Sequence, residues 1–147
     1  MTPLRPSTVF KVQVQFGDCD PAGIVFFPNY SRWMDAASLH FFRECGVPAW
    51  RDLERSHGIV GTPLLEIHTR FLKPATYGDW LEIHTEVEAW RGKVFVQLHR
   101  VTRDGELLSE GRETRAFCAR LADGKLKAVP VPADILALCG GAPEPQV

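Results

Sequence analysis

The sequence predicts an α+β domain in which an antiparallel sheet curls around one long central helix. Two observations carry this prediction. One alternating strand precedes a helical segment, and about four long alternating segments follow it. The helical segment is apolar over much of its circumference, and such a helix is usually buried rather than laid on a surface. The strands are therefore expected to wrap around it.

The elements of the first third of the chain have clear signals. A strand is expected at 9–16, where apolar and polar residues alternate with period two. The central helix is expected at 27–45, where apolar residues recur at nearly helical spacing, as Trp33, Met34, Ala37, Phe41 and Cys45. Gly46 and Pro48 end this helix. A short second helix is expected at 49–56.

The rest of the chain is expected to form mainly strands. Alternating apolar residues place them at 65–71, 81–89, 94–98 and 114–118. Asp-Gly pairs at 104–105 and 123–124 predict hairpin turns. A last short helix is expected from Pro132 or Ala133 to Cys139. Long edge strands in such a sheet invite pairing with a second subunit, so a homo-oligomer is expected.

Length, charge and cysteine content fit one globular domain. The chain has 147 residues, and we expect a single domain at 1–139 followed by a flexible tail at 140–147 that is rich in Gly and Pro. A net charge of -1 argues against nucleic acid as the main partner. No apolar run is long enough for a membrane span, and the start does not resemble a signal peptide. Four cysteines without a CxxC pair indicate free thiols in a cytoplasmic protein with no metal site and no cofactor.

The most informative segment, FGDCDPAGIVFFPNY, connects the first strand to the central helix. It places Asp18 and Asp20 in a turn directly ahead of four bulky apolar residues. Free N–H groups at a helix N-terminus stabilise a developing oxyanion, and a carboxylate beside an apolar pocket serves as a nucleophile or a base. On spacing alone, such an Asp is more often a turn or cap residue, and the pair is a weak metal signal.

This loop and several later segments resemble one family. The run FGDCDPAGIVFFPNYSRWMDAAS, followed by CGVPAWR, GIVGTP, EAWRGKVFVQ and VPADILALC, resembles the 4-hydroxybenzoyl-CoA thioesterases of the hotdog-fold superfamily over most of the chain. The resemblance implies the hotdog fold, a sheet wrapped around one helix, in agreement with the strand and helix count. It also implies hydrolysis of an aromatic acyl-CoA, such as 4-hydroxybenzoyl-CoA, to the free acid and CoA.

The resemblance assigns roles to particular residues. Asp20 matches the family's catalytic carboxylate, which attacks the thioester carbonyl to form a mixed anhydride or activates a water. Phe27 matches a residue whose backbone N–H polarises that carbonyl; the family has Tyr there, but only the amide is needed. The residues implied to line the aromatic acyl pocket are Tyr30, Asp35, Trp50 and Thr62. Asp35 would need a partner there, such as a substrate phenol, an indole N–H or a hydroxyl.

Basic residues are expected to hold the CoA phosphates. Arg91 and Lys93 in WRGKVF match the family's contacts, but Gly92 stands where the family has a second basic residue. Arg112, Arg115 and Arg120 are other candidates, although a lone Arg on a strand face is usually solvated. The histidines and the thiols are interpreted as structural or solvated groups. Family members commonly pair two dimers into a tetramer.

Three other functions stay open at this point. The substrate is a short- or medium-chain aliphatic acyl-CoA in the first of them. The second is a hotdog dehydratase, which needs a His and a Glu, and the loop before the central helix has no His. The third is a hotdog module that binds acyl-CoA without catalysis. The sequence fixes neither the ring substituents of an aromatic substrate nor the choice between anhydride formation and water attack.

Overall fold

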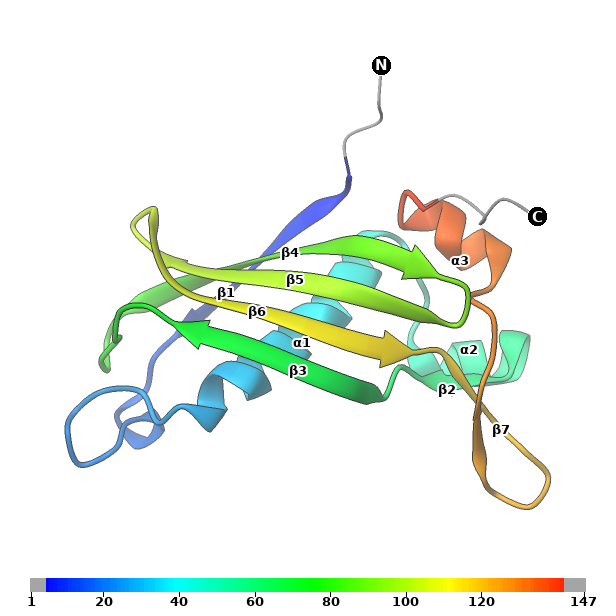
Figure 1. The fold of residues 1–147 in the computed structure, drawn as a ribbon, viewed down its shortest axis with the longest axis horizontal. Helices are drawn as coiled ribbons and strands as arrows, with labels where there is room; N and C mark the ends of the chain where they lie inside the picture. The colour runs from blue at the N-terminus through cyan, green and yellow to red at the C-terminus, as the bar shows by residue number, and fades with distance from the viewer. Residues whose placement is uncertain (1–4, 142–147) are drawn as a thin grey trace.

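The computed structural model describes residues 5–141, and its main feature is a five-stranded antiparallel sheet (Figure 1). The strand order in the sheet is β1 (Ser7–Gln13), β4 (Trp80–Arg91), β5 (Val94–Arg103), β6 (Glu106–Ala116) and β3 (Leu64–Phe71). The strands predicted at 65–71, 81–89 and 94–98 are present as β3, β4 and β5, and the strand predicted at 9–16 is present as β1 but ends earlier, at Gln13. Asp104 and Gly105 form the β5–β6 turn with positive φ angles of 51° and 81°. The predicted tail lies mostly outside the described residues.

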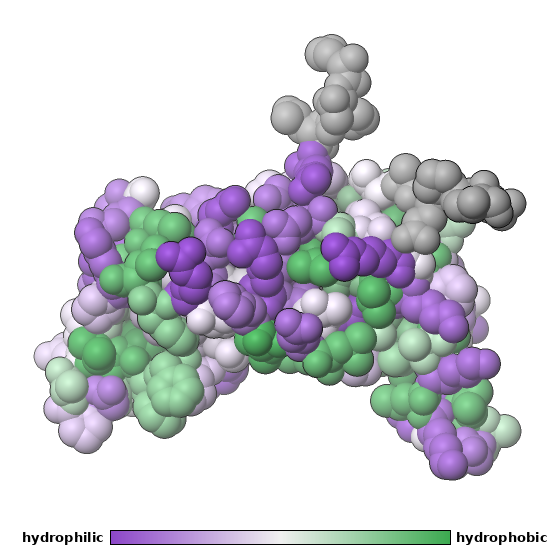
Figure 2. All heavy atoms as spheres, viewed as in Figure 1, coloured by the Kyte–Doolittle hydropathy of each residue, from purple (hydrophilic) through white to green (hydrophobic). Residues whose placement is uncertain are grey.

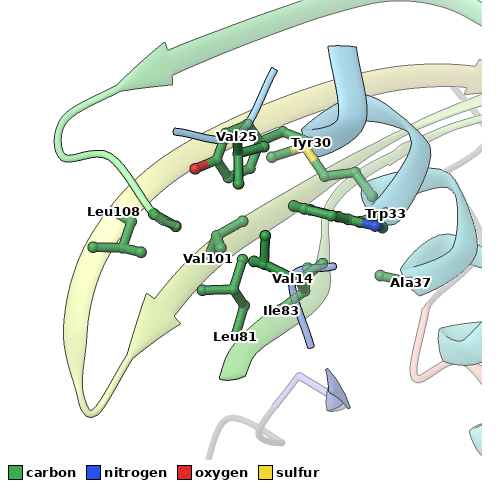
Figure 3. Close-up of a cluster of buried hydrophobic side chains, with 11 residues drawn as sticks. Val14, Val25, Tyr30, Trp33, Ala37, Leu81, Ile83, Val101 and Leu108 are labelled. Carbon is green, nitrogen blue, oxygen red and sulfur yellow. The ribbon is translucent and has the colours of Figure 1, made fainter. Parts of the chain in front are cut away.

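One helix, α1 (Pro28–Glu44), packs across one face of this sheet, as the sequence predicts (Figure 1). Its first half meets the sheet through Tyr30, Trp33, Met34 and Ala37, which are at most 5% exposed. Figure 3 shows these helix residues converging with side chains of β4, β5 and β6. Burying an aliphatic or aromatic side chain of this size contributes about 1.5–3 kcal/mol. This packing fixes where the N-terminus of α1 lies.

The second half of α1 packs in an aromatic cluster. Phe42 meets Trp50, Phe95 and Phe117 with ring centroids 5.4–5.9 Å apart. Close approach of α1 to the sheet also depends on Gly111 of β6, because a Cβ there would lie 2.6 Å from the Met34 sulfur. The helix is therefore seated on the sheet at both ends, and the loop before it has a defined position.

Short helices and strands, only some of which the sequence predicts, cover the end of the sheet that holds the β4–β5 turn. Helix α2 (Trp50–His57) and helix α3 (Ala133–Leu138) are close to their predicted positions. The predicted strand at 114–118 is wrong as one unit, because β6 ends at Ala116 and Cys118 begins β7. Phe117 between them is buried, and its N–H donates to the Lys93 carbonyl (3.0 Å). The second sheet has three strands: β2 (Ile59–Gly61), β7 (Cys118–Arg120) and β8 (Leu126–Ala128).

Strands β1 and β3 form the two edges of the main sheet. Strand β3 and the residue after it carry exposed apolar side chains, with Leu65 61%, Ile67 45%, Phe71 51% and Leu72 47% exposed. Figure 2 shows apolar surface along this edge. Such an edge is a template for pairing with another strand. Within residues 5–141, no helix has the length and hydropathy needed to cross a bilayer.

Candidate active site

A tight turn presents Asp20 at the start of α1. The Asp20 carbonyl accepts the Gly23 N–H, and the Asp20 N–H donates to the Ile24 carbonyl, both at 2.9 Å. Gly23 adopts a φ of 83°, which glycine tolerates without strain. The Ala22 N–H donates to Oδ1 of Asp20 (2.9 Å), while Oδ2 accepts no hydrogen bond from the described residues. Asp20 is therefore partly a turn residue, with one carboxylate oxygen left for chemistry.

Asp18, the other acid of the pair, is committed to holding the loop. Its carboxylate accepts the Gln15 N–H (2.8 Å) and pairs with Arg32 (2.9 Å), and its backbone carbonyl accepts Nδ2 of Asn29 (2.8 Å). The short 3-10 helix η1 (Phe16–Asp18) begins in this cap. These contacts use both oxygens of Asp18, so Asp20 is the member of the pair that is chemically available.

The entry to α1 offers one backbone donor. Residue N1 of the helix is Pro28, which has no N–H, and the N–H groups of Asn29 and Tyr30 donate to the carbonyls of Phe26 and Phe27. The Phe27 N–H finds no acceptor among the described residues. It lies at the positive end of a 17-residue helix dipole. Of the helix N-terminal amides predicted as oxyanion donors, the Phe27 N–H is therefore the one left available to bind a thioester oxygen.

Asp20 and Phe27 line the same pocket. This pocket has a volume of about 410 Å³ and is walled by Ile24, Val25, Tyr30, Phe71, Leu72, Lys73 and Pro74. The volume lies in the range of small-molecule sites, and the walls are mainly apolar. Burial raises the pKa of the Tyr30 phenol above its ordinary value, although its hydrogen bond with the Ala75 backbone opposes the shift. Tyr30 is thus a neutral wall of this pocket.

The four predicted acyl-pocket residues do not share one pocket within the chain. Tyr30 lies beside Asp20, whereas Asp35, Trp50 and Thr62 line a second pocket of about 240 Å³ with Arg115. The first pocket is at the Phe71 end of β3, and the second is near its Leu64 end, where Leu64 pairs with Arg115. One chain therefore holds two separate pockets at opposite ends of its edge strand.

Arg115 is the partner of Asp35, and this pairing is not apparent from the sequence. Its Nη2 donates to Oδ1 of Asp35 (2.9 Å) and its Nη1 donates to the Thr62 carbonyl (3.0 Å). The expectation that a lone strand Arg is solvated is wrong here, because Arg115 is 5% exposed. The missed signal was the period-two alternation of β6, which puts Glu113 and Arg115 on the inner face with Gly111.

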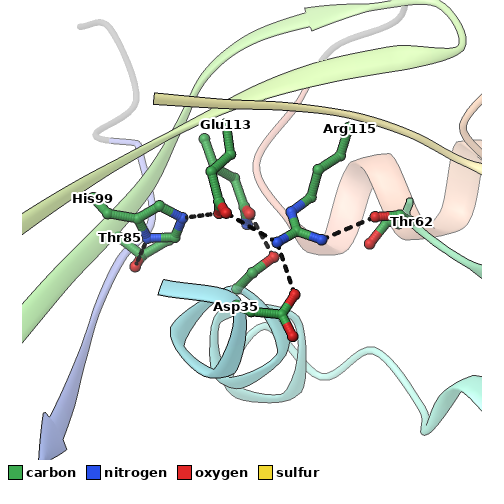
Figure 4. Close-up of polar contacts among 8 residues, drawn as sticks. Asp35, Thr62, Thr85, His99, Glu113 and Arg115 are labelled. Atoms are coloured by element: carbon green, nitrogen blue, oxygen red, sulfur yellow. Dashed lines mark hydrogen bonds and ion pairs between the residues drawn. The ribbon is translucent and has the colours of Figure 1, made fainter. Parts of the chain in front are cut away.

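A buried polar row continues behind Arg115 (Figure 4). Glu113 accepts from Arg115 (3.1 Å) and pairs with Nε2 of His99 (2.5 Å), and Nδ1 of His99 meets the Thr85 hydroxyl (2.7 Å). Burial by itself raises the pKa of Glu113, but the His99 and Arg115 contacts outweigh it and lower that pKa. Glu113 is therefore held as a buried carboxylate.

Arg91 and Lys93, the predicted phosphate contacts, are far from Asp20 of the same chain. They flank the β4–β5 turn, and Trp80 at the other end of β4 pairs with Gln13 near the Asp20 loop. Strand β4 has 12 residues, so it is about 40 Å long. The Lys93 carbonyl accepts the N–H of Phe117, which is two residues along the chain from Arg115 of the second pocket. Burial raises the pKa of the Cys118 and Cys139 thiols, which fits structural roles.

Comparison with known proteins agrees with this geometry. Residues 14–138 match the family model described as the thioesterase-like superfamily. The chain is 46% identical over 139 residues to a 4-hydroxybenzoyl-CoA thioesterase from Pseudomonas sp. (strain CBS-3), a match that covers 90% of this chain and 97% of that protein. A crystal structure of that enzyme superposes with a TM-score of 0.87 at 43% identity, and covers 92% of this chain and 100% of the other.

Two further solved structures have the same fold. One is a 4-hydroxybenzoyl-CoA thioesterase variant in which an aspartate is replaced by asparagine, in complex with 4-hydroxybenzoyl-CoA; its TM-score is 0.87 at 43% identity, over 90% of this chain and 98% of that one. The other is a gentisyl-coenzyme A thioesterase with a TM-score of 0.77 at 32% identity, over 91% of this chain and 100% of that one. The chain belongs to the thioesterase-like superfamily and is a thioester hydrolase of the hotdog fold.

Proposed function

We propose that this enzyme hydrolyses an aromatic acyl-CoA, 4-hydroxybenzoyl-CoA or a close analogue, to the free acid and CoA in the cytoplasm. The observation that carries the proposal is that one apolar pocket contains both the Asp20 carboxylate and the Phe27 N–H, which has no acceptor among residues 5–141. The names of two relatives support the substrate class, since they act on 4-hydroxybenzoyl and gentisyl thioesters, both of which carry a hydroxylated ring.

The chemistry follows from these two groups. The Phe27 N–H donates to the thioester oxygen, and the charge that develops on this oxygen is stabilised by the dipole of α1. Asp20 attacks the carbonyl carbon to form a mixed anhydride, and the C–S bond breaks to release the CoA thiolate. Water then hydrolyses the anhydride to the acid and restores the carboxylate. In the alternative route, Asp20 removes a proton from a water that attacks the same carbon.

A second copy of the chain completes the acyl pocket in this proposal. Strand β3 is an exposed apolar edge, and a two-fold axis would pair it antiparallel with its copy. That pairing places the Leu64 end of one strand beside the Phe71 end of the other. The pocket with Asp35, Trp50 and Thr62 then lies next to the partner's Asp20 pocket, on the same face of the joined sheet. Arg91 and Lys93 likewise serve the active site of another protomer, and two such dimers form a tetramer.

The proposal is tested by measuring CoA release from a panel of aryl and alkyl thioesters. We expect 4-hydroxybenzoyl-CoA to be preferred over butyryl-CoA. Asp20→Asn keeps the Ala22 hydrogen bond and should fold normally but lose at least ~10²-fold in turnover, whereas Asp18→Asn should lose much less. Preference for butyryl-CoA would favour the aliphatic alternative, and no CoA release from any thioester would favour a binding module. An Asp20→Asn enzyme with more than about a tenth of wild-type turnover contradicts the catalytic role.

A further inference from the structure

The row of buried polar groups between β4, β5, β6 and α1 has no place in the chemistry described above. Arg115 is part of the wall of the Asp35 pocket, Glu113, His99 and Thr85 continue the row behind it, and each of the four is at most 5% exposed. Figure 4 shows the chain of contacts running from Thr85 to Asp35. Buried ionic groups are costly unless they are paired, so a row of this kind in a small core calls for an explanation.

We propose that Arg115 is a positioning residue that fixes the Asp35 carboxylate as the acceptor for a ring hydroxyl, and that Glu113 and His99 hold Arg115 in place. This inference rests on the proposed function and deepens it. It makes Arg115, a buried group in the pocket wall, responsible for selecting a substrate with a hydrogen-bond donor at the far end of its ring.

The geometry of Arg115 supports this assignment. Its guanidinium is held from three sides: by Glu113 (3.1 Å), by the Thr62 carbonyl (3.0 Å) and by Asp35 (2.9 Å). The Asp35 side chain is 67% exposed in the single chain, and a helix-surface Asp of this kind would ordinarily sample several rotamers. Arg115 engages its Oδ1, so the carboxylate has one orientation, and its Oδ2 has no donor among residues 5–141.

The charges explain why an arginine is needed. Arg115 faces two carboxylates, Asp35 and Glu113, and its planar fork contacts both through one nitrogen while the other nitrogen binds the backbone. A lysine has a single point charge and cannot reproduce this arrangement. The lowered pKa of Glu113 agrees with a permanent negative charge behind Arg115. Bonding of Glu113 to His99 (2.5 Å) and of His99 to Thr85 (2.7 Å) limits movement of the whole row.

The expected consequence is discrimination between hydroxylated and plain rings. A site built to accept a hydrogen bond rejects an analogue without the donor, because its own buried polar group is then unpaired. Discrimination requires that the acceptor be fixed, since a mobile carboxylate can turn to solvent. Loss of Arg115 should therefore weaken the preference for a 4-hydroxyl group more than it weakens binding of the plain ring.

The experiment measures binding of two non-hydrolysable thioether analogues, 4-hydroxyphenacyl-CoA and phenacyl-CoA, by calorimetry. The readout is the ratio of their Kd values. We expect wild type to prefer the hydroxylated analogue, and Arg115→Lys to lower this preference at least about fivefold, as Asp35→Asn does. The double variant should lose no more than Asp35→Asn alone, because both changes remove the same interaction. Arg100→Lys, on the outer face of β5 and paired with Glu86 and Glu110, is the matched control and should keep the wild-type ratio.

Several outcomes would overturn the proposal. A wild-type ratio near one, or an Arg115→Lys protein that binds both analogues more weakly by the same factor, contradicts a positioning role. If Arg115→Lys does not fold, Glu113→Gln replaces it, because it keeps the shape and removes the charge behind Arg115; an unchanged ratio in this variant also overturns the proposal. If instead the proposed function is wrong, the result differs: wild type binds the hydroxylated analogue selectively but releases no CoA from 4-hydroxybenzoyl-CoA.

Discussion

At the scale of single residues, the Phe27 amide is the group whose role can be isolated most cleanly. Phe27 has a φ of -54°, which suits proline, and its N–H has no acceptor in the described structure. Phe27→Pro therefore deletes the donor, while Phe27→Ala deletes the same ring and keeps the donor. We expect Phe27→Pro to be ~10²–10³-fold slower in kcat than Phe27→Ala, as is typical for loss of one oxyanion donor. Steady-state CoA release, with thermal unfolding as the check on folding, measures this difference.

The comparison between the two variants carries the argument. Both lose the aromatic contact with Phe71, whose ring centroid lies 6.5 Å from that of Phe27, so any change in the apolar wall is common to them. Equal kcat values for the two folded variants would mean that the thioester oxygen is stabilised elsewhere.

The sequence predicts the site unevenly at this scale. The position of Asp20 and Phe27 at the helix entry follows from local signals, a turn and a helix start, whereas their catalytic roles come from the family resemblance and stay predictions. The sequence does not separate Asp18 from Asp20 on physical grounds, since the distinction depends on Arg32 and on the Gln15 N–H. It names Arg115 only as a possible phosphate contact and misses its pairing with Asp35, because the two residues are 80 positions apart and meet only where α1 packs on the sheet.

At the scale of elements, the connection between β3 and β4 forms one wall of the Asp20 pocket, and its stability should depend on pH. Asp79 accepts the Thr76 N–H (3.0 Å) and pairs with Arg103 of β5 (2.8 Å). These contacts, the Thr76 bond first, lower the pKa of Asp79 below its ordinary value of 3.8, against the opposing effect of burial. A carboxyl whose folded-state pKa is lowered stabilises the fold above its unfolded pKa and loses that contribution as pH falls through the folded value.

Asp79→Asn tests this dependence, because the amide retains an acceptor for Thr76 and removes the charge. At pH 7 we expect the variant to be less stable than wild type by about 1 kcal/mol. The difference should shrink as pH is lowered from about 5 to 3, and urea unfolding at a series of pH values measures it. Glu54→Gln on α2, a carboxylate without an ion pair among the described residues, is the control. A difference that stays constant over this pH range would contradict the ionic account.

The elements themselves were predictable where their patterns are long. Strands β4 and β5 and helix α1 each bury one face, so their periodicity is visible in the sequence. The small sheet was not, because β2, β7 and β8 have three residues each and three residues cannot display an alternation. The end of β6 just before Phe117 was not predictable for a related reason. A buried Phe fits either a continuing strand or a turn that is anchored in the core.

At the scale of the whole molecule, the separation of the two pockets along β3 is the observation that supports the proposed second copy of the chain. The Asp20 pocket and the Asp35 pocket lie at opposite ends of the same edge strand. If each active site combines the Asp20 of one protomer with the Asp35 pocket of its partner, a defect in either pocket disables only the site to which it contributes. Two inactive variants with defects in different pockets should then restore one site when they are paired.

Ala36→Trp and Asp20→Asn supply these two defects. Ala36 is an exposed residue that lines the second pocket, and Trp would fill much of its 240 Å³. In a heterodimer of the two variants, one site receives both defects and the other receives none, so we expect about half of the wild-type turnover per dimer. Coexpression with two different affinity tags isolates the heterodimer, and CoA release measures its activity. A heterodimer of Asp20→Asn with Asp20→Ala is the control and should stay inactive, because both of its sites lack the carboxylate. If each site were built within one chain, the Ala36→Trp and Asp20→Asn heterodimer would be as inactive as this control.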